Sequence, residues 1–199
     1  WFGFNAGSAL GAGPLAANAV LTTQMSAAIG IVGWVLVERY HRGKPTVLGA
    51  VSGGVSGLVA ITPAAGFVTP VAAIPIGFVG AICCYVAVAV LKSKFGYDDS
   101  LDAFGIHGVG GMWGAIATGL FATVSVNPDG ADGLFYGGNL LIPQLISLVV
   151  AIALAIIGTT IIFKVVSLFM DMRVSISAES LGIDISEHGE GAYNQSEFK

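Results

Sequence analysis

Charged side chains are scarce in this sequence: Asp, Glu, Lys and Arg make up 10% of its 199 residues. Soluble domains carry about 25% charged residues, so this chain has too few to cover a surface that faces water. Hydrophobic residues account for 55% of the chain, and its mean hydropathy is +0.84. This composition favours a protein that folds in lipid.

Cysteine is also scarce, and the two residues present, Cys83 and Cys84, are adjacent in an apolar run. Neighbours on a helix point in different directions, so the pair is unsuited to a disulfide or a metal site. We expect both to be small buried apolar residues. The net charge is −4 and arises in residues 171–199, so no basic surface for nucleic acid is expected.

Five apolar segments predict membrane spans at about 18–40, 45–62, 68–95, 100–125 and 137–170. They predict an all-α, polytopic membrane helix bundle over residues 1–170, followed by a tail at 171–199. A partial helix is expected at about 1–12. Because the chain opens with apolar residues and no cap, we expect an N-terminal part to be missing.

Basic residues are absent from the loops around 13–17, 63–67 and 126–136. With the five predicted spans, all eight Lys and Arg residues fall on one side of the membrane. By the positive-inside rule that side is cytoplasmic, so the tail is predicted to be cytoplasmic. The eight residues are Arg39, Arg42, Lys44, Lys92, Lys94, Lys164, Arg173 and Lys199.

Small residues recur four apart at Gly49, Gly53 and Gly57, and again at Gly110 and Gly114. This spacing leaves a groove that lets another helix backbone approach closely. We favour a role in helix packing, and the alternative is that these residues line a pore.

His107 lies in the glycine-rich apolar stretch 101–114. An ionisable group at membrane depth is costly and therefore indicates a functional site, and imidazole exchanges protons near neutral pH. On an α-helix its neighbours would be Gly110, Gly111 and Gly114, which leave room for a ligand. The alternative is a structural histidine bonded to a backbone carbonyl.

Asp99 or Ser100 is a natural N-cap for the helix that carries His107, which would place Asp102 in its first turn. Asp102 is then either a capping residue or a carboxylate that organises the inner mouth of a pore. In the N-terminal segment, Phe4 and Ser8 are four residues apart on one helix face. An aromatic ring beside a hydroxyl suits a small cation, although such residues also simply pack.

Ordered motifs resemble the ammonium transporter (Amt/Mep/Rh) family, Amt branch, along essentially the whole chain. They are residues 1–8 (WFGFNAGS), 43–45 (GKP), 62–66 (TPAAG), 98–108 (DDSLDAFGIHG) and 188–193 (HGEGAY). The resemblance implies the second half of an eleven-helix fold made of two inverted halves and assembled as a homotrimer. It also implies an integral protein of the plasma or inner membrane that conducts ammonium or ammonia.

The resemblance assigns roles to individual residues. His107 is similar to the second of two pore histidines, Phe4 to a gate phenylalanine, Ser8 to the hydroxyl of the outer ammonium site, and Asp102 to the acidic residue near the cytoplasmic pore end. The tail is similar to the segment that touches a neighbouring subunit and bears on GlnK-type regulators. Its matching residues are Gly182, Asp184, His188, Gly189, Glu190 and Tyr193.

Two other functions remain open. An ammonium sensor would use the same fold and signal through its tail. A membrane enzyme or metal protein would use His107 and Asp102, but residues five apart on a helix share no face and no further ligand joins them. We therefore expect no enzyme activity, no catalytic or metal centre and no cofactor.

Overall fold

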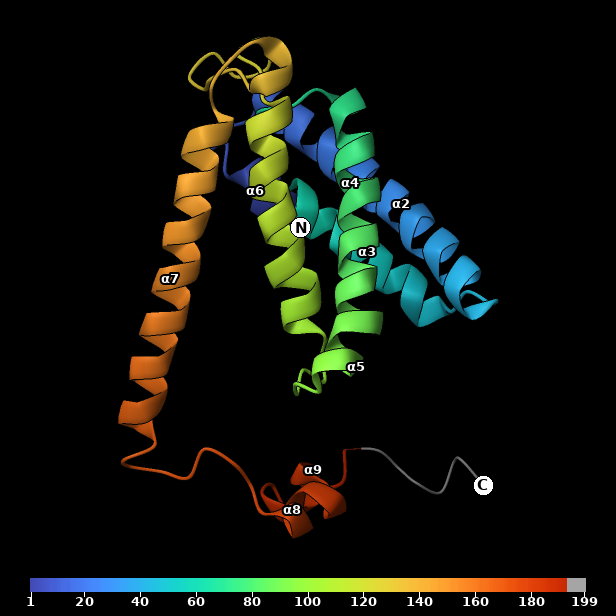
Figure 1. Cartoon of the computed structure of the whole chain (residues 1–199), viewed down its shortest axis with the longest axis vertical. Helices are drawn as coiled ribbons and strands as arrows, with labels where there is room; N and C mark the ends of the chain where they lie inside the picture. The colour runs from blue at the N-terminus through green and yellow to red at the C-terminus, as the bar shows by residue number, and fades with distance from the viewer. Residues whose placement is uncertain (193–199) are drawn as a thin grey trace. The chain divides into compact units, whose positions relative to one another are not determined.

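The computed structural model describes residues 1–192, and its regular elements in that range are all helical (Figure 1). The chain divides into two compact units, Trp1–Val150 and a second that starts at Ala151. The helices of the first unit are α1 (Phe2–Gly7), α2 (Pro14–Arg42), α3 (Val47–Ile61), α4 (Pro70–Val86), η1 (Ala87–Leu91), α5 (Lys92–Phe95), η2 (Phe104–Gly108), α6 (Val109–Phe121) and η3 (Leu134–Tyr136). Helix α7 (Leu141–Val166) begins in the first unit, and α8 (Ile176–Leu181) and α9 (Ile183–Ser186) lie in the second.

The boundaries of these helices follow local sequence signals. Pro14 is the first residue of α2, where a missing N–H does no harm. That helix ends at Gly43, which adopts the left-handed conformation at φ 80°. Thr46 and Thr69 cap α3 and α4, and each side chain accepts a backbone N–H of the first turn.

Close backbone approach holds α2 and α3 together. A methyl group added at Gly30 would lie 2.5 Å from the carbonyl oxygen of Gly53, and one at Gly57 would overlap the carbonyl of Ser26. Ser26 Oγ also donates to Gly57 O at 2.7 Å. The predicted packing role of the small residues is confirmed for Gly53 and Gly57, whose missing side chains let the two helices touch.

The core is built from small side chains. Its main cluster contains seven buried alanines together with Ile61, Val68 and Ile76, drawn mainly from α3, α4 and the connection between them. Helices α4 and α6 run side by side next to this cluster (Figure 1). Trp113 on α6 crosses that contact, and its Nε1 donates to Ile76 O at 2.9 Å.

Three helical stretches of the described chain are long and apolar enough to cross a membrane: Pro14–Arg42, Pro70–Phe95 and Leu141–Val166. The predicted segments at 45–62 and 100–125 form shorter helices than expected. Helix α3 has 15 residues because Thr46 caps it and Pro63 follows its end. The other segment starts helically only near residue 103, because residues 96–102 form an ordered loop.

Candidate functional site

His107 lies in a π-helical turn, η2, which leads directly into α6. Such turns are rare and occur frequently at functional sites. Gly105 and Ile106 beside it are buried, whereas His107 is exposed in this structure. The π-helical turn changes which residues lie beside the imidazole, so neighbours deduced from α-helical spacing do not apply here.

The prediction that Gly110, Gly111 and Gly114 leave room for a ligand beside His107 is wrong for two of the three glycines. A side chain at Gly110 would meet Cys84 Sγ and Val59 Cγ1, each at 3.1 Å, and one at Gly114 would lie 2.5 Å from Ala60 O. These two glycines pack against α4 and α3. Gly111 alone of the three has open space beside it, because a methyl group added there would have nothing within 4 Å.

Trp1 is the nearest aromatic neighbour of His107. The two rings are stacked, with centroids 6.3 Å apart and planes at 23°. Trp1 Nε1 donates to Thr62 Oγ1 at 2.8 Å, which fixes the indole against the end of α3. Trp1 also meets Phe4 edge to face, with centroids 5.9 Å apart. Trp1 thus lies between two predicted site residues, in an aromatic row made of Phe4, Trp1 and His107.

Phe4 and Ser8 line a cavity of about 210 Å³ together with Asn5, Thr62 and Phe67. Ser8 Oγ donates to the carbonyl oxygen of Phe4 at 2.7 Å. That bond uses the only hydrogen of the hydroxyl, so its lone pairs are left to accept. The cavity therefore offers an aromatic ring on α1 and an accepting hydroxyl on the residue that caps the C-terminus of the same helix.

Asn5 was not predicted to belong to this site. It is 8% exposed, and its Nδ2 donates to Thr23 Oγ1 at 2.9 Å. Its Oδ1 is buried without a donor among the described residues. A polar residue in an otherwise apolar helix is the sequence feature that could have identified Asn5. A helix as short as α1 shows no periodicity from which the direction of its side chain can be deduced.

Asp102 does not occupy the first turn of a helix, contrary to the sequence prediction. It precedes the helix and has a left-handed backbone at φ 55°. The capping residue is Asp99, whose carboxylate accepts the N–H groups of Ala103, Phe104 and Gly105 at 2.8, 3.0 and 3.3 Å. The side chain of Asp102 pairs instead with Lys92, at 2.7 Å from Nζ to Oδ1.

The structure separates Asp102 from Phe4 and Ser8. Asp102 and Lys92 line a second cavity, of about 260 Å³, whose other polar residues include Glu38 and Arg42. Glu38 is 3% exposed and accepts from the backbone N–H and the hydroxyl of Thr46, each at 3.0 Å.

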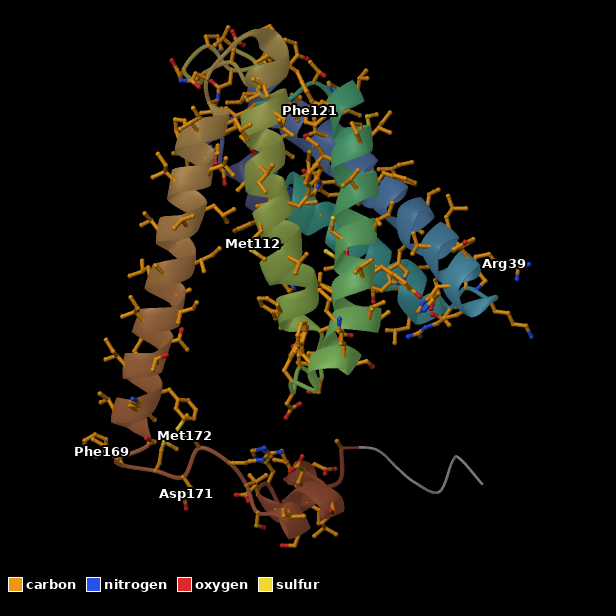
Figure 2. All side chains as sticks on the ribbon, in the orientation of Figure 1. Arg39, Met112, Phe121, Phe169, Asp171 and Met172 are labelled. Atoms are coloured by element: carbon orange, nitrogen blue, oxygen red, sulfur yellow. The ribbon has the colours of Figure 1, made fainter. Side chains whose placement is uncertain are left out.

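The basic residues of the first unit fall into two groups, Arg39 to Lys44 and Lys92 to Lys94. One member of each group, Arg42 and Lys92, lines this second cavity. Arg39, in the first group, is exposed at the end of α2 (Figure 2). The cavity of Phe4 and Ser8 is lined instead by the loops at residues 65–67 and 127, which carry no Lys or Arg.

The described residues contain no group of three or more His, Cys, Asp or Glu side chains that could hold a metal ion. Cys83 and Cys84 are both free thiols. Cys84 is fully buried as expected, and its Sγ donates to Ile106 O at 3.5 Å, beside His107. Cys83 is only partly buried.

The tail residues predicted to be regulatory form a compact turn after α8. Gly182 has φ 102°, which an L side chain rarely adopts, and starts α9. The Asp184 carboxylate accepts the N–H of Ala192 at 2.9 Å, and this bond holds the pKa of Asp184 below its ordinary value. Glu190 N donates to Asp184 O at 3.1 Å, and His188 and Gly189 complete the turn. Tyr193 lies outside the described residues.

Comparison with known proteins assigns the chain to a family. The model of the Ammonium Transporter Family matches residues 1–193. The chain is 56% identical to an ammonium transporter of Bacillus subtilis (strain 168) over 98% of its own length and 49% of that protein. It therefore spans about half the length of the curated relatives it matches, which are named transporters rather than enzymes.

Solved structures agree with this assignment. The crystal structure of Saccharomyces cerevisiae Mep2 matches with a TM-score of 0.78 at 35% identity, over 85% of this chain and 40% of that one. A structure described as a sensor Amt protein matches with a TM-score of 0.83 at 27% identity, over 94% of this chain and 45% of that one. The chain is a helical membrane protein that belongs to the ammonium transporter family.

Proposed function

We propose that this chain forms the second half of an ammonium transporter that conducts ammonium or ammonia through a hydrophobic pore lined in part by His107. The observation that carries the proposal is the aromatic row of Phe4, Trp1 and His107, which extends from the cavity of Ser8. Membership in a family whose relatives are named ammonium transporters supports ammonium as the substrate.

The outer site of this proposal consists of Phe4 and Ser8. An ammonium ion has four N–H donors and a positive charge. The lone pairs of Ser8 Oγ accept one N–H, since its hydrogen is engaged with Phe4 O. The face of Phe4, with Trp1 at its edge, attracts the charge through the ring quadrupole. This combination selects a small cation over water.

Passage beyond the aromatic residues requires loss of the charge. A cation inside the apolar bundle costs several kcal/mol or more, so the ion loses a proton and neutral ammonia enters the narrow apolar region. His107 borders this path with an imidazole that donates or accepts one hydrogen bond in its neutral form. The proton that leaves ammonium passes to water or to a basic group outside the bundle.

Orientation follows from the basic residues. Asp102 lies beside Lys92 and Arg42 at the second cavity, and the positive-inside rule makes this end cytoplasmic. Asp102 is then the carboxylate at the inner mouth, and the tail is cytoplasmic. The large exposed apolar surface of α7 supports a location in a membrane, and we assign the plasma or inner membrane from the family resemblance.

A homotrimer and a GlnK-type regulator complete the proposal. Both come from the family resemblance of the chain, and the acidic turn around Asp184 and Glu190 is the segment we assign to contact with a neighbouring subunit and with the regulator. An ammonium sensor is the second candidate function, and the likeness to the solved sensor Amt protein favours it. Deleting residues 171–199 separates the two, because a sensor loses signalling while transport continues.

The direct test is ammonium uptake, or ammonium-evoked current, in proteoliposomes that contain the intact protein, with the His107→Ala variant beside it. We expect altered rate or selectivity in the variant, since it removes the imidazole that borders the path. Unchanged rate and selectivity would remove His107 from the mechanism. Absence of any ammonium-dependent flux in the unmodified protein would overturn the transport proposal itself.

A further inference from the structure

The loop before His107 holds a strained residue. Asp102 has φ 55°, and the only other non-glycine residue with a positive φ in the described chain is Leu10. The left-handed conformation is unfavourable for most L-residues, and Asp adopts it where its short polar side chain makes a local bond. Asp102 directly precedes Ala103, where the helix that carries His107 begins.

Lys92 makes such a bond with Asp102. Its Nζ lies 2.7 Å from Asp102 Oδ1, and the same ammonium group donates to the backbone carbonyl of Asp99. The side chains of Lys92 and Asp102 are 28% and 30% exposed, so water screens their ion pair only partly. One ammonium group thus ties together both ends of the four-residue loop Asp99–Asp102.

The loop in turn defines how the helix of His107 starts. The carboxylate of Asp99 accepts three consecutive N–H groups, at Ala103, Phe104 and Gly105. The carbonyl oxygen of Asp102 accepts the N–H of Ile106 at 2.9 Å. Every backbone N–H from residue 103 to residue 106 is therefore bonded to the loop that Lys92 holds, and His107 is the next residue.

Packing leaves this turn little freedom to adjust. A methyl group at Gly105 would lie 2.6 Å from Val88 Cγ2, so the π-helical turns η1 and η2 are in close contact. Lys92 follows η1 directly in the sequence. The residue that clamps the loop is thus attached to the same element that packs against the turn of His107.

We propose that Lys92 is a positioning residue for His107. By holding Asp99 and Asp102, it fixes the start of the π-helical turn and so directs the imidazole toward Trp1. This inference rests on the proposed function, in which His107 borders the path of ammonia. Lys92 acts through the loop and does not touch the substrate.

The test compares Lys92→Met with Lys94→Met in the intact protein, reconstituted in proteoliposomes. Methionine keeps an unbranched side chain and removes the charge, and Lys94 is an exposed lysine on the same helix. Four quantities are measured: the initial rate of ammonium uptake, the ratio of ammonium to methylammonium uptake, the pH dependence of ammonium uptake, and amide hydrogen exchange in residues 103–108. We expect Lys92→Met to lower uptake by roughly tenfold. This is less than the roughly hundredfold that a 1 Å misplacement of reacting groups costs, because His107 borders the path and does not react.

The same variant should alter the uptake ratio and the pH profile and speed exchange in residues 103–108, whereas Lys94→Met should match the unmodified protein. Lys92→Arg should restore most of the uptake, because guanidinium also bonds both acceptors. If Lys92→Met fails to assemble, Asp102→Gly replaces it, because glycine accepts the positive φ but removes the ion pair. Its readout is faster amide exchange in residues 103–108, which loss of a carboxylate at the inner mouth would not by itself produce.

Two results separate this inference from the proposed function. Normal uptake ratio and pH profile in Lys92→Met, or unchanged exchange of residues 103–108 in Asp102→Gly, together with altered uptake in His107→Ala, would overturn the positioning role of Lys92 alone. Normal uptake in His107→Ala would overturn the role of His107, whatever Lys92→Met does.

Discussion

The indole of Trp1 stacks on the imidazole of His107, with ring centroids 6.3 Å apart and planes at 23°. Trp1 is anchored by its bond to Thr62 Oγ1, at the end of a different helix. The position of the imidazole therefore depends on contacts from two sides, one made by its own backbone turn and one by an aromatic residue far away in the sequence.

Replacing Trp1 should disturb His107 even though the imidazole is unchanged. Trp1→Leu removes the stack, and a contact of this kind is worth about 0.5–1.5 kcal/mol, so we expect uptake to change by roughly twofold to tenfold. Trp1→Phe keeps an aromatic ring and loses only the bond to Thr62, and its effect should be smaller. The measurement is initial ammonium uptake. In a double-mutant cycle with His107→Ala, additive effects would show that the two rings are not coupled.

Ser8→Ala should weaken capture of ammonium. The change removes the hydroxyl whose lone pairs face the cavity of Phe4, and a hydrogen bond to a charged group contributes about 1.5–3 kcal/mol. We expect the concentration for half-maximal uptake to rise by roughly tenfold or more, with a smaller change in maximal rate. Ser8→Thr keeps the hydroxyl and serves as the control. Equal half-saturation in the alanine variant and the unmodified protein would exclude Ser8 from the outer site.

Gly57→Ala should destabilise the bundle, because the added methyl group would overlap the backbone of Ser26, which cannot swing aside as a side chain can. Overpacking of this kind costs about 1–3 kcal/mol, so the midpoint of thermal unfolding in detergent should fall. Gly158→Ala in α7 is the matched control, since nothing lies within 4 Å of its added methyl group. Similar midpoints for the two variants would contradict the close approach of α2 and α3.

The turn around Asp184 should depend on pH. Its bond to the N–H of Ala192 holds the pKa of Asp184 below the ordinary value. Because the folded-state pKa is depressed, the stabilisation is present above the ordinary carboxyl pKa, about 3.9, and is lost as the pH falls through the lower folded value. Neutral pH therefore leaves the turn intact.

The check for Asp184 is its carboxyl titration by carbon-13 NMR. The midpoint in the folded protein should lie below that of the same tail sequence unfolded in urea. Equal midpoints in the two samples would mean that the carboxylate does not hold Ala192. Asp184→Asn should loosen the turn equally at every pH, because the asparagine side chain does not ionise.

Features set by nearby residues were predictable from the sequence. Hydropathy indicated a helical membrane protein, and the glycine spacing indicated a surface where another helix packs closely, which the structure shows to be α2. Both depend on residues within one or two helical turns. The family and the helical fold followed from ordered motifs, and the comparisons confirm them.

Features set by distant residues were not predictable. Thr62 anchors Trp1 across 61 positions, so no local pattern marks Trp1 as the neighbour of His107. The left-handed backbone of Asp102 depends on Lys92, ten positions away on the preceding helix. A capping motif at Asp99 was visible, but the π-helical turn after it was not, because hydrophobic periodicity over five residues does not distinguish it from an α-helix.

The two π-helical turns have a consequence for insertions and deletions. A π-helical turn is in effect an α-helix that has accepted one additional residue. Removing one residue from Phe104–Gly108 would restore an α-helical turn with little rotation of what precedes it relative to α6, and the wide turn that carries His107 would be lost. The partner turn, Ala87–Leu91, packs against it through Val88 and Gly105. A one-residue deletion in either turn is therefore expected to keep the flanking helix in register and to change the contact between the two turns.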